Sequence, residues 1–244
     1  MKTSKIILSL LSLSVLAFSS CNKYGLCVKA NGPVETRAIS IASFSEIDLT
    51  EDAEVYVHQG KEQSVTVTAA PNIIDILDNS VIGNRWEIDF DRHCAKNYHM
   101  VVDITIPKLT NIVISGDGNI FVDDFTGKGM LDLTLSGSGK IVLNKFDGIT
   151  DINALLTGSG SIVAQNKQIN INNLDIGITG SGYFKGFGIE TKNCDALLTG
   201  SGDIKTTVTE NLLVKITGSG DVYYKGNPSV NSKITGSGDV RNVN

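Results

Sequence analysis

Several residue types are scarce in this sequence. Only 4 of its 244 residues are proline and only 3 are histidine, and aromatic residues make up 6%. Three histidines leave little material for a Ser-His-Asp arrangement, which argues against an enzyme of that kind. The 25 glycines predict many tight turns, because glycine adopts backbone angles that other residues avoid. With 41% hydrophobic and 19% charged residues, the composition is that of a folded chain.

The sequence also lacks an excess of positive charge. Lys and Arg number 21 against 26 Asp and Glu, which gives a formal net charge of −5. No basic stripe or polybasic cluster is present, so we expect neither nucleic acid nor a charged lipid surface as a partner. The chain is long enough for one solenoid or for one to two compact domains.

An apolar run long enough to span a membrane is missing, but a shorter one stands at the N-terminus. It covers residues 6–18 and follows Lys2 and Lys5. A bilayer requires about 20 apolar residues, so this run is too short to cross one. Its length is typical of a signal-peptide core, and we assign residues 1–20 to a signal peptide.

The end of this run, Leu16-Ala17-Phe18-Ser19-Ser20-Cys21, resembles a bacterial lipobox, in which the cysteine becomes the lipid-modified first residue. Phe18 departs from the usual leucine, and the alternative is an ordinary signal peptide cleaved near Ser19. The resemblance implies that Cys21 carries several acyl chains, with residues 21–32 as a linker. We therefore expect an outer-membrane anchor that leaves the protein on the periplasmic face or on the cell surface. Residues 22–25 lack the acidic cluster that marks surface export in some lipoproteins, which favours the periplasm.

Three cysteines follow Cys21. An envelope compartment permits disulfides, and Cys27 with Cys94 is the pair we consider, the alternative being that both stay reduced. Cys194 falls in a column of apolar residues, so we interpret it as a small core residue and not as a reactive thiol.

The most informative feature is a tetrapeptide that recurs every 18 to 22 residues. It begins with Ser or Thr, has glycine at its second and fourth positions, and has Ser or Asp between them. Its copies start at Ser115, Ser136, Thr157, Thr179, Thr199, Thr217 and Thr235. Self-similarity at such a period is typical of a solenoid, in which each repeat forms one coil.

The residues around each tetrapeptide alternate between inward and outward positions. The residue directly before each copy is always Ile or Leu, and the second residue after it is Ile, Val or Phe. This alternation indicates a β-strand with one buried face, and a flexible Gly-Ser linker would lack it. We therefore predict that each strand lies on the equivalent strand of the next coil, about 4.8 Å away.

The predicted fold is all-β. We assign residues 111–244 to a right-handed single-stranded parallel β-helix and residues 33–110 to a β-rich N-terminal cap. Left-handed hexapeptide helices need coils of fixed length, which only the last two steps match. Leucine-rich repeats need a leucine pattern that is missing, and calcium-binding nonapeptide rolls repeat twice as often.

A family resemblance rests on residues 37–90 together with the tandem coils. The segments Phe44-Ser45-Glu46-Ile47 and Val55-Tyr56-Val57-His58-Gln59-Gly60, followed by the T-G-S-G coils, resemble the head GIN domain family of auto-transporter adhesins. The resemblance implies a parallel β-helix on an exported protein of Gram-negative bacteria, often a lipoprotein. It implies less about function, because the adhesin label rests on little chemistry.

Catalytic and metal-binding groups are sparse. The serines of the tetrapeptides stand between glycines at a turn and not in the G-x-S-x-G pattern of a nucleophile elbow. His93 and Cys94 with His99 could supply metal ligands, but their spacing matches no familiar site, and the alternative is a surface loop. We therefore expect no catalytic residues, no metal and no cofactor.

One outward column is a candidate ligand surface. Asp203, Asp221 and Asp239 fall on successive coils as a column of like charge. Such a column is unfavourable unless solvent and Lys205 relieve it or a cation bridges it. Tyr183 stands one coil earlier in the same column.

A second outward column contains Tyr223, which together with Tyr183 could stack on sugar rings. It begins with Phe121, Val142 and Val163, and we expect the N-terminal segment or a partner chain to cover these apolar side chains.

Two functions are compatible with these residues. The first is a non-catalytic, envelope-anchored adhesin or binding module for a glycan or for an envelope or host protein. The second is a periplasmic structural or scaffold lipoprotein. A polysaccharide-active β-helix enzyme ranks third. The open strand edge expected at the C-terminus also favours homo-oligomers.

Overall fold

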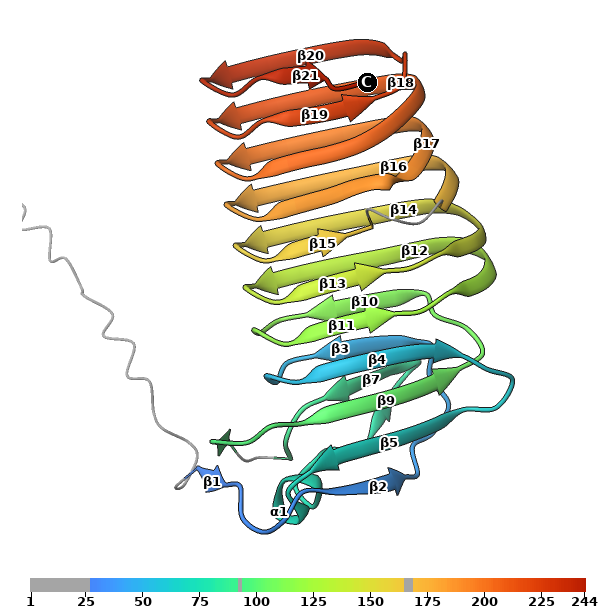
Figure 1. Cartoon of the computed structure of the whole chain (residues 1–244), viewed down its shortest axis with the longest axis vertical. Helices are drawn as coiled ribbons and strands as arrows, with labels where there is room; N and C mark the ends of the chain where they lie inside the picture. Colours follow the sequence, from blue (N-terminus) through green and yellow to red (C-terminus); the bar gives the residue numbers. More distant parts are fainter. Residues whose placement is uncertain (1–26, 92–93, 165–168) are drawn as a thin grey trace, which may run out of the picture.

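The described residues form the parallel β-solenoid that the repeat predicts (Figure 1). The computed structural model describes residues 27–91, 94–164 and 169–244. The expected signal peptide (1–20) and the expected lipid-modified Cys21 lie outside the described residues, as do residues 22–26 of the linker. No helix in the described ranges is long and apolar enough to cross a membrane.

Each coil contains a first strand before a corner and a second strand after it, and from β10 onwards this corner is the tetrapeptide. From the N-terminal end of the solenoid, the first strands are β7 (Arg85–Ile88), β3 (Glu46–Leu49), β10 (Asn111–Ile114), β12 (Phe125–Gly137), β14 (Phe146–Gly158), β16 (Ile169–Gly180), β17 (Tyr183–Gly200), β18 (Asp203–Gly218) and β20 (Ser229–Gly236). The second strands are β9 (Val101–Ile106), β4 (Glu54–Gln59), β11 (Asn119–Val122), β13 (Lys140–Leu143), β15 (Ser161–Val163), the beginnings of β17 and β18, β19 (Val222–Lys225) and β21 (Val240–Asn242).

The register places like residues on top of one another. Thr157 pairs with Thr179, which pairs with Thr199, and the inward residues before them are all buried. Cys194 lies in an inward column and is buried, and burial raises the pKa of its thiol to about 12. The alternation of the sequence therefore becomes one continuous core, and Cys194 is a core residue as predicted.

The corners explain why the tetrapeptide keeps its glycines. Gly200 has a φ of +127°. A Cβ atom there would also overlap the carbonyl oxygen of Gly180 in the neighbouring coil. A Cβ atom at Gly202 would overlap the carbonyl oxygen of Gly182 in the same way. The backbones of successive corners approach so closely that only glycine fits.

The segment from 33 to 110 adds coils of its own to the stack. Strands β3 and β4 lie between two neighbouring coils, because β3 pairs with both β7 and β10 and β4 pairs with both β9 and β11, all in parallel. The chain thus forms the inner coil first, then the outermost coil, and then crosses over to begin the repeat. The corner between β3 and β4 contains no glycine, so the tetrapeptide does not identify this coil.

The N-terminal end of the solenoid is closed by short elements. Strand β5 (Ser64–Ala69) pairs antiparallel with β9, and β2 (Glu35–Ile39) pairs antiparallel with β5. Helix α1 (Pro71–Ile74) buries Ile73 and Ile74, and β6 (Val81–Ile82) forms a hairpin with β7. Trp86 of β7 is fully buried, and its ring lies 5.5 Å from that of Phe44.

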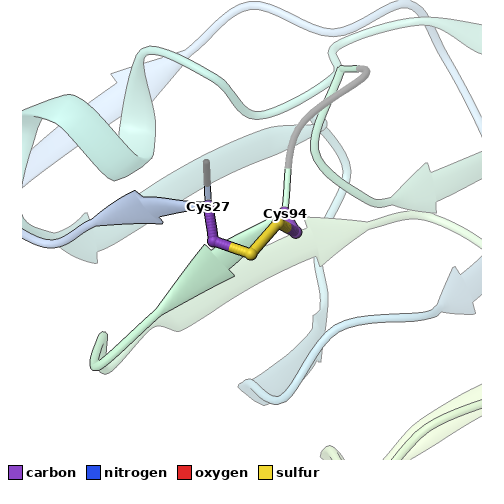
Figure 2. The surroundings of a disulfide bond; sticks show 2 residues. All are labelled: Cys27 and Cys94. Atoms are coloured by element: carbon purple, nitrogen blue, oxygen red, sulfur yellow. A yellow bond between two sulfur atoms is a disulfide. The ribbon is translucent and has the colours of Figure 1, made fainter. Parts of the chain in front are cut away.

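A disulfide joins Cys27 to Cys94 at this closed end (Figure 2). Cys27 precedes β1 (Val28–Lys29), and Cys94 precedes β8 (Ala95–Lys96), and these two strands pair in parallel. The predicted pairing is therefore confirmed. The bond fastens the N-terminal end of the described chain to the loop between β7 and β9.

The C-terminal end of the solenoid is open. Strand β20 pairs only with β18 and β21 only with β19 among the described strands. Val230 and Ile234 occupy inward positions of this last coil, yet they are 39% and 40% exposed. The unpaired edge expected from the sequence is present.

Candidate functional site

The predicted aspartate column forms, and the protein itself satisfies its charges. The backbone N–H of Asp221 donates to Oδ1 of Asp203 at 3.1 Å, and the N–H of Asp239 donates to Oδ1 of Asp221 at 2.8 Å. Arg241 donates through Nε to Oδ2 of Asp239 at 2.9 Å and lies 3.6 Å from Oδ2 of Asp221. The hydrogen bond from Arg241 lowers the pKa of the Asp239 carboxyl, as does the backbone N–H of Val240.

The expected role of Lys205 was wrong. Its ammonium lies 5.5 Å from the centre of the Tyr223 ring, and Arg241 supplies the positive charge to the aspartates instead. The Tyr223 hydroxyl also donates to Oδ2 of Asp221, at 2.9 Å. The described residues contain no group of three or more side chains arranged to hold a metal ion.

The two tyrosines do not form a joint platform. Tyr183 pairs in register with Asp203, whereas Tyr223 belongs to the adjacent outward column and lies two coils away. Lys185 lies 5.6 Å from the centre of the Tyr183 ring. The Lys205 ammonium lies 5.5 Å from the centre of the Tyr223 ring, and the Arg241 guanidinium lies 5.8 Å from the same ring centre. Each ring therefore has at least one cation within about 6 Å of its centre, which competes with a sugar for the ring.

The apolar stripe of Phe121, Val142 and Val163 is half-buried. Tyr56 of β4 stacks on Phe121 with ring centres 5.1 Å apart. The N-terminal segment therefore contacts the stripe, as one of our two alternatives predicts. Tyr56 pairs in register with Phe121, so it extends the stripe by one coil and does not cover it.

The metal-ligand arrangement considered for His93, Cys94 and His99 is not available. Cys94 is bonded to Cys27, so its thiolate cannot bind a metal, and His93 lies outside the described residues. The third histidine, His58, has Nδ1 2.7 Å from Oδ2 of Asp123 on the exposed surface.

A groove on the outward face of the first strands was not predicted. It has a volume of about 680 Å³ and extends over β12, β14, β16, β17 and β18. We call it the leucine groove. Its floor is one outward column that contains Leu155, Gly177 and Leu197. Its rim is the neighbouring outward column, which contains Asp132, Asn153, Asp175 and Asp195 and continues to Leu213 on the next coil. Leu155 is 49% exposed, and Leu197 and Leu213 are each 46% exposed, so three large apolar side chains are exposed on one face within four coils.

Gly177 forms the hollow of the leucine groove. It pairs in register with Leu155 on one side and Leu197 on the other, so a gap separates two leucines in one outward column. Its φ is not in the left-handed region, and a Cβ atom there would meet only Leu155, with Cδ1 at 3.2 Å. Unlike the corner glycines, Gly177 is not required by the backbone, and its consequence is an open space on the surface.

The acidic rim has two parts with different partners. Asn153 donates through Nδ2 to Oδ1 of Asp132 at 2.8 Å. Asp175 and Asp195 pair in register on neighbouring coils, and neither has a hydrogen-bond or ion-pair partner within the described part of the chain. The pKa of Asp175 is raised, first by burial and then by the charges of Asp195 and Asp151.

A neighbouring column of side chains flanks Asp175 and Asp195, and each member of that column is hydrogen-bonded to the next. Asn173 donates to Oδ1 of Asp151 at 2.6 Å, Asn193 to Asn173 at 3.2 Å, and Asn211 to Asn193 at 2.8 Å. Hydrogen bonds from Thr150 and Asn173 lower the pKa of Asp151. Asp175 and Asp195 receive no such donors, so this pair is the exception on the face.

A signal for the groove was present in the sequence. Leu155 and Leu197 stand two positions before their tetrapeptides, between inward residues, and therefore point outward. We considered only the outward positions after the tetrapeptide, so the three leucines and the intervening glycine were missed.

A family model described as "Putative auto-transporter adhesin, head GIN domain" matches residues 43–228. This match spans more than half of the chain. The chain belongs to this family. The matched region begins just before β3 and ends just before β20, so it contains the N-terminal coils, every tetrapeptide except the last and the leucine groove.

Three solved structures share this fold. A "putative adhesin" from Bacteroides fragilis is 21% identical, with a TM-score of 0.81 over 88% of this chain and 100% of that one. A "putative adhesin" from Parabacteroides distasonis is 27% identical, with a TM-score of 0.72 over 88% of this chain and 99% of that one. A "putative lipid binding protein" from the same species is 22% identical, with a TM-score of 0.71 over 89% and 99%. No curated protein matches the chain.

Proposed function

We propose that this head GIN domain protein is a non-catalytic binding protein of the cell envelope and that its ligand, a glycan or a protein, occupies the leucine groove. The groove is the observation that carries the proposal. It combines exposed leucines, a hollow at Gly177 and two carboxylates without partners on one rigid face. Apolar side chains combined with a small number of polar groups are typical of a binding site.

The envelope location is supported from two directions. The N-terminal run and the lipobox-like residues before Cys21 favour a lipid anchor. The Cys27–Cys94 disulfide favours an oxidising compartment. Because that bond ties the chain near Cys21 to the closed end of the solenoid, an anchor at Cys21 would hold this end nearest the membrane. The coils from β12 to β18, which carry the leucine groove, would then lie farther from the membrane than the closed end (Figure 1).

Binding to glycan and peptide arrays tests the proposal. We would label the mature protein and apply it to a glycan array and to a peptide array, alongside the variant Gly177→Leu, which fills the hollow. The matched control is Gly127→Leu, because a Cβ atom at Gly127 meets nothing within 4 Å and its φ is also outside the left-handed region. Binding on either array that Gly177→Leu removes and Gly127→Leu retains would support the proposal. Binding that both variants retain would place the site elsewhere.

The same two carboxylates could serve a polysaccharide-cleaving enzyme, which needs a pair of acids. Incubation of the protein with the glycans that bind separates the two functions. We expect the glycans to be recovered intact, and reducing ends released by the wild type but not by Asp175→Asn would show catalysis.

A scaffold inside the periplasm is a second candidate, favoured by the open edge of β20 and β21. Protease treatment of intact cells, with a known periplasmic protein as control, distinguishes the two candidates. Digestion would place the protein outside and support the adhesin. Protection until the outer membrane is opened would favour the scaffold, which light scattering should then show as an oligomer.

A further inference from the structure

We infer that the leucine groove binds a short protein segment that carries a Lys or Arg next to aliphatic side chains. This inference rests on the proposed function and names the class of its partner. Three features of the groove lead to it: the charge of its rim, the chemistry of its floor and its length.

The rim calls for a positive charge. Like charges directly opposite each other on neighbouring strands are unfavourable. Elsewhere on the solenoid such carboxylates are relieved by Arg241 or by asparagine side chains. Asp175 and Asp195 have neither kind of partner in the described chain, so a cation from outside would complete the pattern.

The floor favours an aliphatic side chain over a sugar. Among the described residues that line the groove none is aromatic, whereas sugar rings commonly stack on aromatic faces. The hollow at Gly177 lies between Leu155 and Leu197, so an aliphatic side chain placed over it would contact leucine on both sides. Contact with these leucines would remove apolar surface from water, which is the main favourable term in association.

The length of the groove suits a short segment. The groove spans four coils, from the coil of Leu155 to the coil of Leu213, which is about 14 Å at the spacing of stacked strands. Lys215 lines the end of the groove nearest the C-terminus. Its charge would repel a cation there and would direct the ligand's positive group towards Asp175 and Asp195.

The test uses three fluorescein-labelled peptides of twelve residues in solution with the mature protein. The first combines Lys and Leu, the second replaces Lys with Glu, and the third replaces Leu with Ser. Fluorescence anisotropy reports binding. We expect only the first peptide to bind, and we expect its affinity to fall as salt is added because salt screens exposed charges.

Two double variants decide whether the groove is the site. Asp175→Asn with Asp195→Asn should weaken binding of the Lys–Leu peptide by roughly tenfold or more. Glu190→Gln with Glu210→Gln changes the net charge equally at exposed positions outside the groove and should leave binding unchanged. Circular dichroism confirms that both variants fold.

The outcomes separate the inference from the proposed function. Equal binding of the Lys and Glu peptides, or equal loss in both double variants, would overturn the inference. Glycan binding that depends on Gly177 without peptide binding would overturn the inference and leave the proposed function standing. If neither array nor peptide shows binding at the groove, both fail.

Discussion

At its N-terminal end the solenoid is closed by β5, β2 and helix α1, whereas at its C-terminal end β20 and β21 leave their outer edges unpaired. The closed end buries Trp86 completely, while inward residues of the last coil remain about two-fifths exposed. The same sequence pattern therefore has different energetic consequences along the stack. An inward residue stabilises the fold only when a further coil or a cap lies over it.

The largest expected effect is at the closed end. Trp86→Ala should lower the free energy of unfolding by about 3–5 kcal/mol, because a large buried aromatic side chain leaves a cavity. Urea unfolding followed by circular dichroism measures the change. A loss below about 1 kcal/mol would show that this end is not tightly packed.

A matched pair in one inward column tests the open end. Ile216 is fully buried, and Ile234 pairs with it in register on the last coil but is 40% exposed. Ile216→Ala should cost about 2–5 kcal/mol, and Ile234→Ala should cost about 1 kcal/mol or less. Equal losses in urea unfolding at low protein concentration would mean that another surface covers the last coil.

Loss of the disulfide should lower the free energy of unfolding somewhat less than loss of Trp86. Replacing Cys27 and Cys94 with Ser should lower stability by about 2–4 kcal/mol, since the bond closes a loop of 67 residues. Thermal unfolding with and without reductant gives the same comparison on the wild type. A reduced protein with an unchanged Tm would show that β2, β5 and α1 close this end unaided.

The smallest expected effect concerns pH. Burial raises the pKa of Asp48 in β3, whereas Arg241 lowers the pKa of Asp239 on the last coil. A raised carboxyl pKa gives stability that is present at low pH and is lost as the pH rises through the folded pKa. A lowered pKa gives stability that is present at neutral pH and is lost as the pH falls through the folded pKa.

Two single variants measure this contrast. Asp48→Asn should raise stability at pH 7 by up to about 1 kcal/mol and should have less effect at pH 4. Asp239→Asn should lower the Tm slightly at pH 7, with the effect disappearing in acid. Thermal melts at both pH values check the signs, and the same sign for both variants at pH 7 would contradict the assignment.

Much of the fold could be predicted because the repeat is local. The inward residue before each tetrapeptide and the glycines at each corner are specified by their neighbours within a few positions. The insertion of β3 and β4 between two later coils could not be predicted. It depends on pairings such as Glu46 with Asn111, which no spacing in the sequence announces.

The site was less accessible to sequence reasoning. The aspartate column followed from the repeat, but the choice of Arg241 over Lys205 as its partner depends on side-chain direction. The leucine groove depends on Leu155, Gly177 and Leu197, which are about one coil apart in sequence and adjacent only after folding. Its hollow is the absence of a side chain, which a search for reactive groups does not detect.

The insertion of β3 and β4 also constrains the order in which the protein can fold. These strands are synthesised before either of their neighbours, and contacts such as Ser45 with Thr110 join positions 65 residues apart. A stable folding nucleus that contains these pairings therefore requires roughly the first 120 residues of the chain. Closing so long a loop slows the formation of this nucleus. Each later coil packs on a folded coil only 18 to 22 residues earlier in the sequence. The remaining coils can therefore fold one after another, each closing only a short loop.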